Sequence, residues 1–514
     1  MDRRDFLADL ARLAALTAVI PNDWRVTLRP RFADDPFTLG VASGDPTPGG
    51  AVLWTRLAPR PLDPDGGMLT AKAAVDWEVA EDDRFAKVVQ KGRATAAIEL
   101  GYSVHVDVTG LQPDRWYWYR FRSGEATSPV GMLRTTPAAG AVVPLAFAFM
   151  SCQKYDDGFF TAYGHLAREA QLDLAVHLGD YIYEGPSGPA AVRAHVGGEI
   201  RVLDDYRRRY AQYKSDPLLQ AAHARCPWLV TWDDHEVDNN YAASVGENEM
   251  ESEEQVRARR AAGYQAWWEH QPVRVPRVRS WADLTITRSA DWGALARLWV
   301  LDTRQYRDDQ ACGDRIQPYG CGAHLDPSRT LLGAAQERWL VDGIGASTAR
   351  WQVLANQVML APADSAPGPE VTTSMDQWSG YPVARDRLLA AIAERAPNRT
   401  VAITGDIHTN WVNELRRGFL RPDQPVVAAE FVGTSITSDG DGRDIPAERW
   451  ATMQRENPHV HWYQSRRGYV HCRVDQGAWH TDYRTVPYVR QPDAPVETAT
   501  RWRLEHGRPG IVRV

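Results

Sequence analysis

Three short motifs decide the fold of this chain: GDYIY at 179–183, WDDHE at 232–236 and TGDIH at 404–408. Each motif directly follows a short apolar run of the kind that forms a strand buried on both faces. In layered α/β folds the carboxyl ends of such strands open into loops, and ligands bind at that edge. The motifs therefore predict a site at one edge of a sheet, built from carboxylates and histidine.

Two further apolar runs have the same form. Residues 145–150 end at Ser-Cys-Gln (151–153), and residues 298–301 end at Asp-Thr-Arg (302–304). Segments with helical periodicity lie between the runs, at 159–170, 203–213, 253–270 and 336–344. This alternation predicts two sheets covered by helices, an αββα sandwich with the site at one edge.

The residues in the motifs offer two kinds of metal ligand. Asp180 is the bridging candidate, because each oxygen of one carboxylate can face a different cation, and His408 offers an imidazole to the first metal. A phenolate from Tyr183 and a thiolate together favour a strongly Lewis-acidic ion such as ferric iron. Hard oxygen ligands suit calcium, magnesium or manganese, and the candidates are Asp234, Asn356 and Asp406. Such cations would lower the pKa of a bound water from about 15.7 toward roughly 7.

Six motifs together resemble the alkaline phosphatase D family. They are SCQ at 151–153, HLGDYIYEG at 177–185, TWDDHEVDNNYA at 231–242, LDTRQYR at 301–307, NQV at 356–358 and TGDIHTNW at 404–411. The resemblance extends from about Phe37 to near Tyr488. It implies a secreted phosphodiesterase and phosphomonoesterase of the calcineurin-like metallophosphoesterases, related to purple acid phosphatases.

The resemblance also implies roles for individual residues. An Fe³⁺ ion would be held by Cys152, Asp180, Tyr183 and His408. Ca²⁺ would be held by Asp180, Asp234, Asn356 and Asp406, and the oxygen ligands would accept Mg²⁺ or Mn²⁺ equally. His235 occupies the place of the histidine that assists the leaving group in the wider superfamily, and Arg304 resembles a phosphate clamp.

Each residue also has a plainer interpretation. A cysteine after an apolar strand is commonly a small buried hydrophobe, which is the alternative for Cys152. Asp180 and Asp406 follow glycine and have the alternative of turn residues. Arg304 has the alternative of pairing with a neighbouring carboxylate, although its guanidinium fork matches phosphate oxygens.

Strand patterns before the catalytic part predict a separate β domain. Runs at 50–55, 74–79, 102–108 and 115–122 alternate between polar and apolar residues, with turn residues between them. They predict an immunoglobulin-like or fibronectin-like β-sandwich, with a tyrosine corner at Tyr117. The predicted organisation is a signal segment (1–30), a β-sandwich (36–136), a metallophosphoesterase domain (144–488) and a C-terminal helix or arm (489–514).

The N-terminus resembles a twin-arginine export signal. Arg3 and Arg4 precede a weakly apolar stretch at 10–20 that is too short to span a bilayer. The alternative is an amphipathic helix, since Asp9 and Arg12 carry charge near or within the stretch. We therefore expect export by the twin-arginine machinery to the periplasm or the extracellular space, and a mature protein without a transmembrane segment.

The cysteines agree with that compartment, and the net charge bears on the partners. Cys312 and Cys321 enclose a Gly- and Pro-containing loop whose ends can meet in a disulfide under oxidising conditions. Cys226 and Cys472 are predicted to be free and buried. The formal net charge of −7 over 514 residues argues against nucleic acid as a stable partner, but it does not exclude phosphate esters.

Three functions fit this sequence. The leading one is a metal-dependent alkaline phosphatase that cleaves phosphomonoesters and phosphodiesters with a metal-bound hydroxide. The second is a diesterase of narrow specificity, either phospholipase D-like or degrading teichoic acid, which would share every ligand. The third is a secreted binding protein with an inactive hydrolase fold, and the complete set of ligand candidates argues against it.

Overall fold

The structure is a computed structural model that describes residues 26–248, 250–318, 321–419 and 423–514. The predicted signal at 1–30 falls mostly on residues 1–25, which lie outside the described residues. In the described part of the chain, no helix is both long and apolar enough to cross a membrane.

A ten-stranded sheet runs through most of the molecule in the order β24-β23-β22-β21-β9-β10-β11-β1-β2-β5. Its central strands β9, β10 and β11 are parallel. The strands are β1 (Val41–Thr47), β2 (Gly50–Arg56), β5 (Ser103–Val108), β9 (Leu145–Met150), β10 (Leu174–His177), β11 (Pro227–Val230), β21 (Arg467–Val474), β22 (Ala478–Val486), β23 (Glu497–Glu505) and β24 (Ile511–Arg513).

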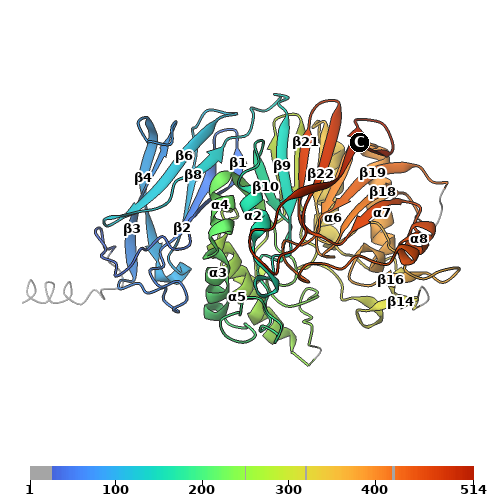
Figure 1. The fold of residues 1–514 in the computed structure, drawn as a ribbon, viewed down its shortest axis with the longest axis horizontal. Coiled ribbons are helices and arrows are strands. Elements are labelled where there is room, and N and C mark those ends of the chain that lie inside the picture. The colour runs from blue at the N-terminus through green and yellow to red at the C-terminus, as the bar shows by residue number, and fades with distance from the viewer. Residues whose placement is uncertain (1–25, 249, 319–320, 420–422) are drawn as a thin grey trace, which may run out of the picture.

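A seven-stranded sheet packs against it in the order β12-β13-β15-β17-β19-β18-β20, with β13, β15, β17 and β19 parallel. Its strands are β12 (Arg288–Trp292), β13 (Ala296–Val300), β15 (Trp351–Ala355), β17 (Thr400–Thr404), β18 (Asn410–Arg416), β19 (Val426–Val432) and β20 (Val460–Gln464). A short ribbon of β14 (Ile316–Pro318) and β16 (Thr372–Ser374) lies near the lower right of Figure 1.

Helices cover the outer faces of both sheets. They are α2 (Thr161–Leu166), α3 (Leu203–Lys214), α4 (Pro217–Arg225), α5 (Glu253–His270), α6 (Gly333–Ala346), α7 (Pro382–Arg395) and α8 (Ala447–Glu456). Alternate residues of each central strand face opposite layers. Phe147 and Phe149 of β9 pack with Val353 of β15 between the sheets, whereas Ala148 and Met150 face the helices. The predicted αββα sandwich is confirmed.

The N-terminal domain is a β-sandwich, blue in Figure 1. One layer is β1, β2 and β5, and the other is β3 (Lys72–Ala80), β4 (Val88–Ala97), β6 (Trp116–Ser123), β7 (Ala126–Thr127) and β8 (Gly131–Arg134). The backbone N–H of Gln112 donates to the hydroxyl of Tyr117 at 3.0 Å, which is the predicted tyrosine corner. β1 pairs in parallel with β11, so this domain shares a sheet with the catalytic part.

The C-terminal residues differ from the expected helix or arm. β23 pairs with β22 and β24 pairs with β23, so both strands extend the ten-stranded sheet. Trp502 and Leu504 are buried against the core between the sheets. The end of the chain is therefore part of the catalytic sandwich, because its alternating apolar residues complete a sheet face.

Candidate metal centre

The site lies where the parallel strands of both sheets end. Cys152, Asp180, Asp406 and His408 all have positive φ, at 58°, 55°, 66° and 52°. Such backbone is uncommon for residues other than glycine and clusters at functional sites. These four side chains therefore take their directions from sharp turns that follow β9, β10 and β17.

Both Gly-Asp turns require glycine. A Cβ atom on Gly179, which has φ 110°, would lie 2.4 Å from the backbone nitrogen of Asp233. A Cβ on Gly405 would lie 2.4 Å from the Ser151 hydroxyl oxygen. The two glycines thus allow neighbouring strand ends to come close enough for their aspartates to share one pocket.

Four of the predicted ligands converge at one point. Ligand atoms of Cys152, Asp180 and His408 all lie within 4.8 Å of one another. The Tyr183 hydroxyl is 3.1 Å from Asp180 Oδ2 and 3.1 Å from His408 Nε2. A thiol, a carboxylate, a phenol and an imidazole are thus gathered around one small space.

A second group of carboxylates adjoins the first. Carboxylate oxygens of Asp233, Asp234 and Asp406 lie within 4.8 Å of one another. Asp180 and Asp234 also come within 4.8 Å of each other and of a ring nitrogen of His235. Asp180 therefore stands between the two groups, in the position expected of a bridging ligand.

Two predicted residues are placed differently from expectation. The Asn356 carbonyl oxygen accepts from the Trp378 indole at 3.1 Å, and its amide donates to Val358 O, so its polar atoms are engaged away from the carboxylates. The Arg304 guanidinium is fully buried and donates to Asp376 at 2.7 Å, to Asp406 at 3.0 Å and to Asp233. Its surroundings match the carboxylate-pairing alternative.

The charge of the pocket favours cations. Burial, followed by the charge of Asp234, raises the pKa of Asp180 well above its usual value. Burial also raises the pKa of Asp233 and Asp406, although Arg304 opposes it in both. Burial acts to raise the pKa of Asp234 too, but the charges of Arg304 and His235 hold it below its usual value.

Buried oxygens that accept no hydrogen bond agree with a metal site. They are Asp233 Oδ2 and Asp234 Oδ1, and Arg304 Nη2 lies 3.6 Å from the second. A buried carboxylate oxygen without a partner is costly unless a cation meets it. With thiol, phenol and imidazole beside the carboxylates, the donor set fits one strongly Lewis-acidic ion and one cation that prefers oxygen ligands.

His235 is held by a residue that the sequence analysis did not assign. Glu184 Oε2 lies 2.7 Å from His235 Nδ1, and the His235 ring lies 4.1 Å from the Tyr183 ring, centroid to centroid. Burial acts to lower the pKa of His235, but the charges of Glu184 and Asp234 raise it well above its usual value. Glu184 ends the YIYE stretch, and this place in the motif is the sequence feature that could have identified it as a site residue.

Glu236 is a second residue that has no role in the predicted site, and its carboxylate holds the backbone of the site in place. Its carboxylate accepts from the backbone N–H groups of Asp180 at 3.0 Å, Tyr181 at 2.6 Å and Asp233 at 2.8 Å. Burial raises its pKa to about 7. One fully buried carboxylate thus ties the turn after β10 to the turn after β11.

The loop at 361–382 supplies two contacts to the site. Asp376 accepts from Arg304, and Gln377 Nε2 donates to Asp406 Oδ2 at 2.5 Å. These residues follow β16 directly, and β16 pairs with β14. The loop therefore contacts the cluster of Asp233, Asp234 and Asp406, directly through Gln377 and by way of Arg304 through Asp376.

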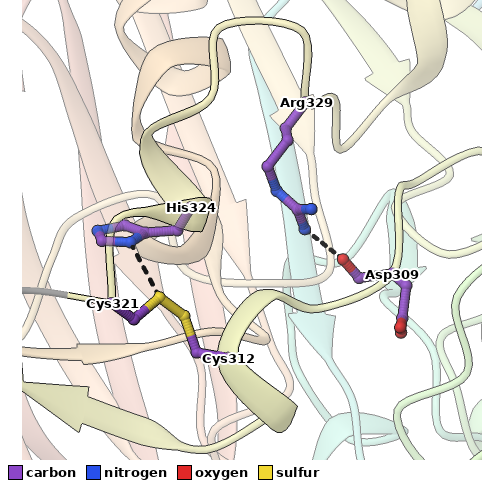
Figure 2. Close-up of a disulfide and its surroundings, with 5 residues drawn as sticks. All are labelled: Asp309, Cys312, Cys321, His324 and Arg329. Carbon is purple, nitrogen blue, oxygen red and sulfur yellow. Dashed lines mark hydrogen bonds between the residues drawn. A yellow bond between two sulfur atoms is a disulfide. The ribbon is translucent and has the colours of Figure 1, made fainter.

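The predicted disulfide between Cys312 and Cys321 is present, with their Cα atoms 6.3 Å apart (Figure 2). Figure 2 shows the His324 ring beside it, with Nδ1 3.6 Å from Cys321 Sγ. Cys226 and Cys472 are free and buried, as expected, and Cys152 is also buried and outside any disulfide. The disulfide closes the segment that contains β14.

Known proteins share this sequence and architecture. The family model described as PhoD-like phosphatase matches residues 147–483, and the model for the N-terminal domain of PhoD-like phosphatases matches residues 23–137. The chain belongs to the PhoD-like phosphatase family. Alkaline phosphatase D of Bacillus subtilis (strain 168) is 46% identical to it, over 100% of this chain and 89% of the relative.

Solved structures agree with the family. The structure of PhoD superposes with a TM-score of 0.91 at 47% identity, covering 94% of this chain and 93% of the other. A purple acid phosphatase from yellow lupin (Lupinus luteus) seeds has a TM-score of 0.55 at 11% identity, covering 92% of this chain and 74% of the other. The second likeness shows a shared fold. The PhoD-like phosphatase described here is a phosphoric ester hydrolase of the alkaline phosphatase D type.

Proposed function

We propose that this PhoD-like phosphatase is an exported alkaline phosphatase that hydrolyses both phosphomonoesters and phosphodiesters. The observation that carries the proposal is the meeting of Cys152, Asp180 and His408 within 4.8 Å, with the Tyr183 hydroxyl 3.1 Å from two of them. Thiolate and phenolate together suit Fe³⁺, and the adjoining carboxylates suit Ca²⁺, with Mg²⁺ or Mn²⁺ as substitutes. When bound, such ions supply an activated water and neutralise phosphate oxygens.

Asp180 is proposed to serve both metal positions, with Asp234 and Asp406 on the calcium side. Asn356 would join them only if its side chain turned away from Trp378, which holds its oxygen in this structure. Arg304 is proposed to keep Asp234 and Asp406 ionised and in place, since its Nη2 lies 3.6 Å from Asp234 Oδ1 and 3.0 Å from Asp406 Oδ1. In this role the arginine acts through the carboxylates and makes no contact with substrate.

His235 is proposed to be the proton donor to the leaving oxygen. Its Nδ1 is engaged by Glu184 at 2.7 Å, which fixes the ring and leaves Nε2 available. The side chain is 18% exposed, so a substrate can reach it from solvent. A positioned acid of this kind contributes about 10²–10⁴-fold to such reactions.

Export by the twin-arginine machinery is proposed from Arg3, Arg4 and the apolar stretch that follows them. The Cys312–Cys321 disulfide supports an oxidising destination, which is the periplasm or the extracellular space. Fusing residues 1–30 to a reporter that is exported only in the folded state tests this. Export that persists when Arg3 and Arg4 are both changed to lysine would contradict it.

The test of the activity compares turnover of bis(p-nitrophenyl) phosphate with that of p-nitrophenyl phosphate at alkaline pH. The protein carries its native metals, and Asp180→Asn is measured in parallel. We expect comparable turnover of both esters, and loss of both in Asp180→Asn with an unchanged circular dichroism spectrum. A strong preference for the diester would indicate a narrow phosphodiesterase, and wild-type-like turnover in Asp180→Asn would contradict its bridging role.

A further inference from the structure

One segment, residues 433–440, contacts the Tyr183 and His408 side chains. It follows β19 and lies alongside the residues after β9, with an isolated parallel bridge between Ser151 and Ser435. The backbone N–H of Ile436 donates to Ser151 O at 3.1 Å. The segment therefore joins the ends of the two sheets at the edge that carries the site.

Ser438 connects two of the proposed iron ligands. Its hydroxyl oxygen lies 2.7 Å from the Tyr183 hydroxyl and 2.8 Å from Cys152 O, and it accepts from the Lys154 N–H at 3.2 Å. The side chain is fully buried. Since a serine has one hydroxyl hydrogen, it can turn that hydrogen to Tyr183 once the phenol has become a phenolate.

Asp439, the next residue, holds His408. Its Oδ2 lies 2.8 Å from His408 Nδ1, and its backbone N–H donates to Asp157 Oδ2 at 2.9 Å. A carboxylate on Nδ1 keeps that nitrogen protonated and leaves the lone pair on Nε2. His408 Nε2 is the atom that lies 3.1 Å from the Tyr183 hydroxyl, so the lone pair faces the proposed iron position.

We propose that Ser438 and Asp439 are positioning residues that together orient Tyr183 and His408 for metal binding. Because the two residues are adjacent, one backbone segment sets both ligands, and it takes its own position from the backbone of Ser151 and Cys152. The inference rests on the proposed metal centre and adds the groups that direct two of its ligands. Neither residue contacts substrate in this role.

The first experiment measures metal retention against a competing chelator in four variants. Ser438→Ala, Asp439→Ala and Asp439→Asn are compared with Thr437→Val, which removes a neighbouring buried hydroxyl that donates only to Lys154 O, at 2.7 Å. We expect Ser438→Ala and Asp439→Ala to weaken metal affinity by about 10–100-fold, which is the usual effect of losing an outer partner. Asp439→Asn keeps an acceptor for Nδ1–H and should fall between Asp439→Ala and the wild type, and Thr437→Val should match the wild type.

The second experiment records the visible absorption of the same proteins. A hydrogen bond to the phenolate lowers its electron-donating strength, so its loss in Ser438→Ala should move a tyrosinate-to-iron band to longer wavelength. The band should not move in Thr437→Val. A purely structural role for Ser438 would change stability without this specific shift.

The two readouts separate this inference from the proposed iron site. Wild-type metal retention and an unmoved band in Ser438→Ala and Asp439→Ala would overturn the inference while the proposed function stands. A wild-type protein without the band, whose variants still lose metal, would overturn the iron assignment and support the positioning role. Equal losses in Thr437→Val and Ser438→Ala would also overturn the inference, because they would show a general loosening of the segment.

Discussion

At the scale of single residues, the site depends on polar groups that are held by partners far away in sequence. Glu184 holds His235 from 51 positions away, and Glu236 ties together the turns that carry Asp180 and Asp233. Removing one partner leaves a buried polar group unpaired, at a cost of about 1–3 kcal/mol. The geometry of the pocket is thus set by its supporting carboxylates as much as by the proposed ligands.

The proposed role of His235 predicts a dependence on the leaving group. His235→Asn should lower kcat by about 10²-fold or more for an alkyl phosphate ester, whose leaving oxygen needs a proton. The loss should be much smaller for a p-nitrophenyl ester, because p-nitrophenolate leaves without protonation. Glu184→Gln should show the same pattern more weakly, since the ring loses its charged partner.

Steady-state kinetics with the two ester types check this prediction. Asn239→Ala serves as a control, because its side chain donates to Glu247 at 2.8 Å. Equal losses for both esters would exclude His235 as the proton donor and would indicate a role in binding alone.

At the scale of elements, strand ends were predictable and loop contacts were not. The apolar runs before Cys152, Asp180 and Asp406 became β9, β10 and β17, because residues buried on both faces carry a strong local signal. The positions of Asn356 and Arg304 depend on Trp378 and Asp376, in a loop without periodicity. Ser438 and Asp439 carried no local signal, because their partners Tyr183 and His408 are distant in sequence.

The β14–β16 ribbon gives an element-scale prediction. The disulfide closes the loop from Cys312 to Cys321, and β14 within it pairs with β16, which leads into Asp376 and Gln377. A loop of this length is stabilised by about 2–3 kcal/mol through its disulfide. The double variant Cys312→Ser/Cys321→Ser should therefore show faster amide hydrogen exchange in β16 and a lower kcat.

Hydrogen exchange followed by mass spectrometry measures this directly, with the amides of α5 as an internal reference remote from the ribbon. Unchanged exchange in β16 together with wild-type kcat would show that the hydrogen bonds of Asp376 and Gln377 hold the loop without the disulfide.

At the scale of the whole molecule, one sheet unites the two domains, since β1 pairs with β11 and β23 and β24 close the opposite edge. Several histidines are buried or half-buried within this body. Burial lowers the pKa of His105 on β5 to about 4 and that of His459, just before β20, to about 4. Both are neutral in the folded state at a pH where the unfolded chain binds a proton, near ~6.5 and below.

The sign of the pH dependence follows from this difference. Because these folded-state pKa values are depressed, the stability that they contribute is complete above pH ~6.5 and is lost as pH falls toward ~4. Each such histidine should lower the free energy of unfolding by about 1.4 kcal/mol per pH unit within that window. The free energy of unfolding can be measured by urea denaturation at several pH values in the window. It should fall less steeply with decreasing pH in His105→Gln, whose amide can still donate to Gln271 O. An identical fall of the unfolding free energy with pH in the variant and the wild type would contradict the low folded-state pKa of His105.

We propose that Cys152, Asp180, Tyr183 and His408 hold iron, and X-ray absorption at the iron K-edge can detect each kind of ligand atom. We expect iron in the purified wild-type protein with one sulfur neighbour, because Cys152 Sγ lies within 4.8 Å of the Asp180 and His408 ligand atoms. We also expect the sulfur contribution to disappear in Cys152→Ser, with only oxygen and nitrogen neighbours left. Iron without a sulfur neighbour in the wild type, or a protein fully active without iron, would rule out this iron site.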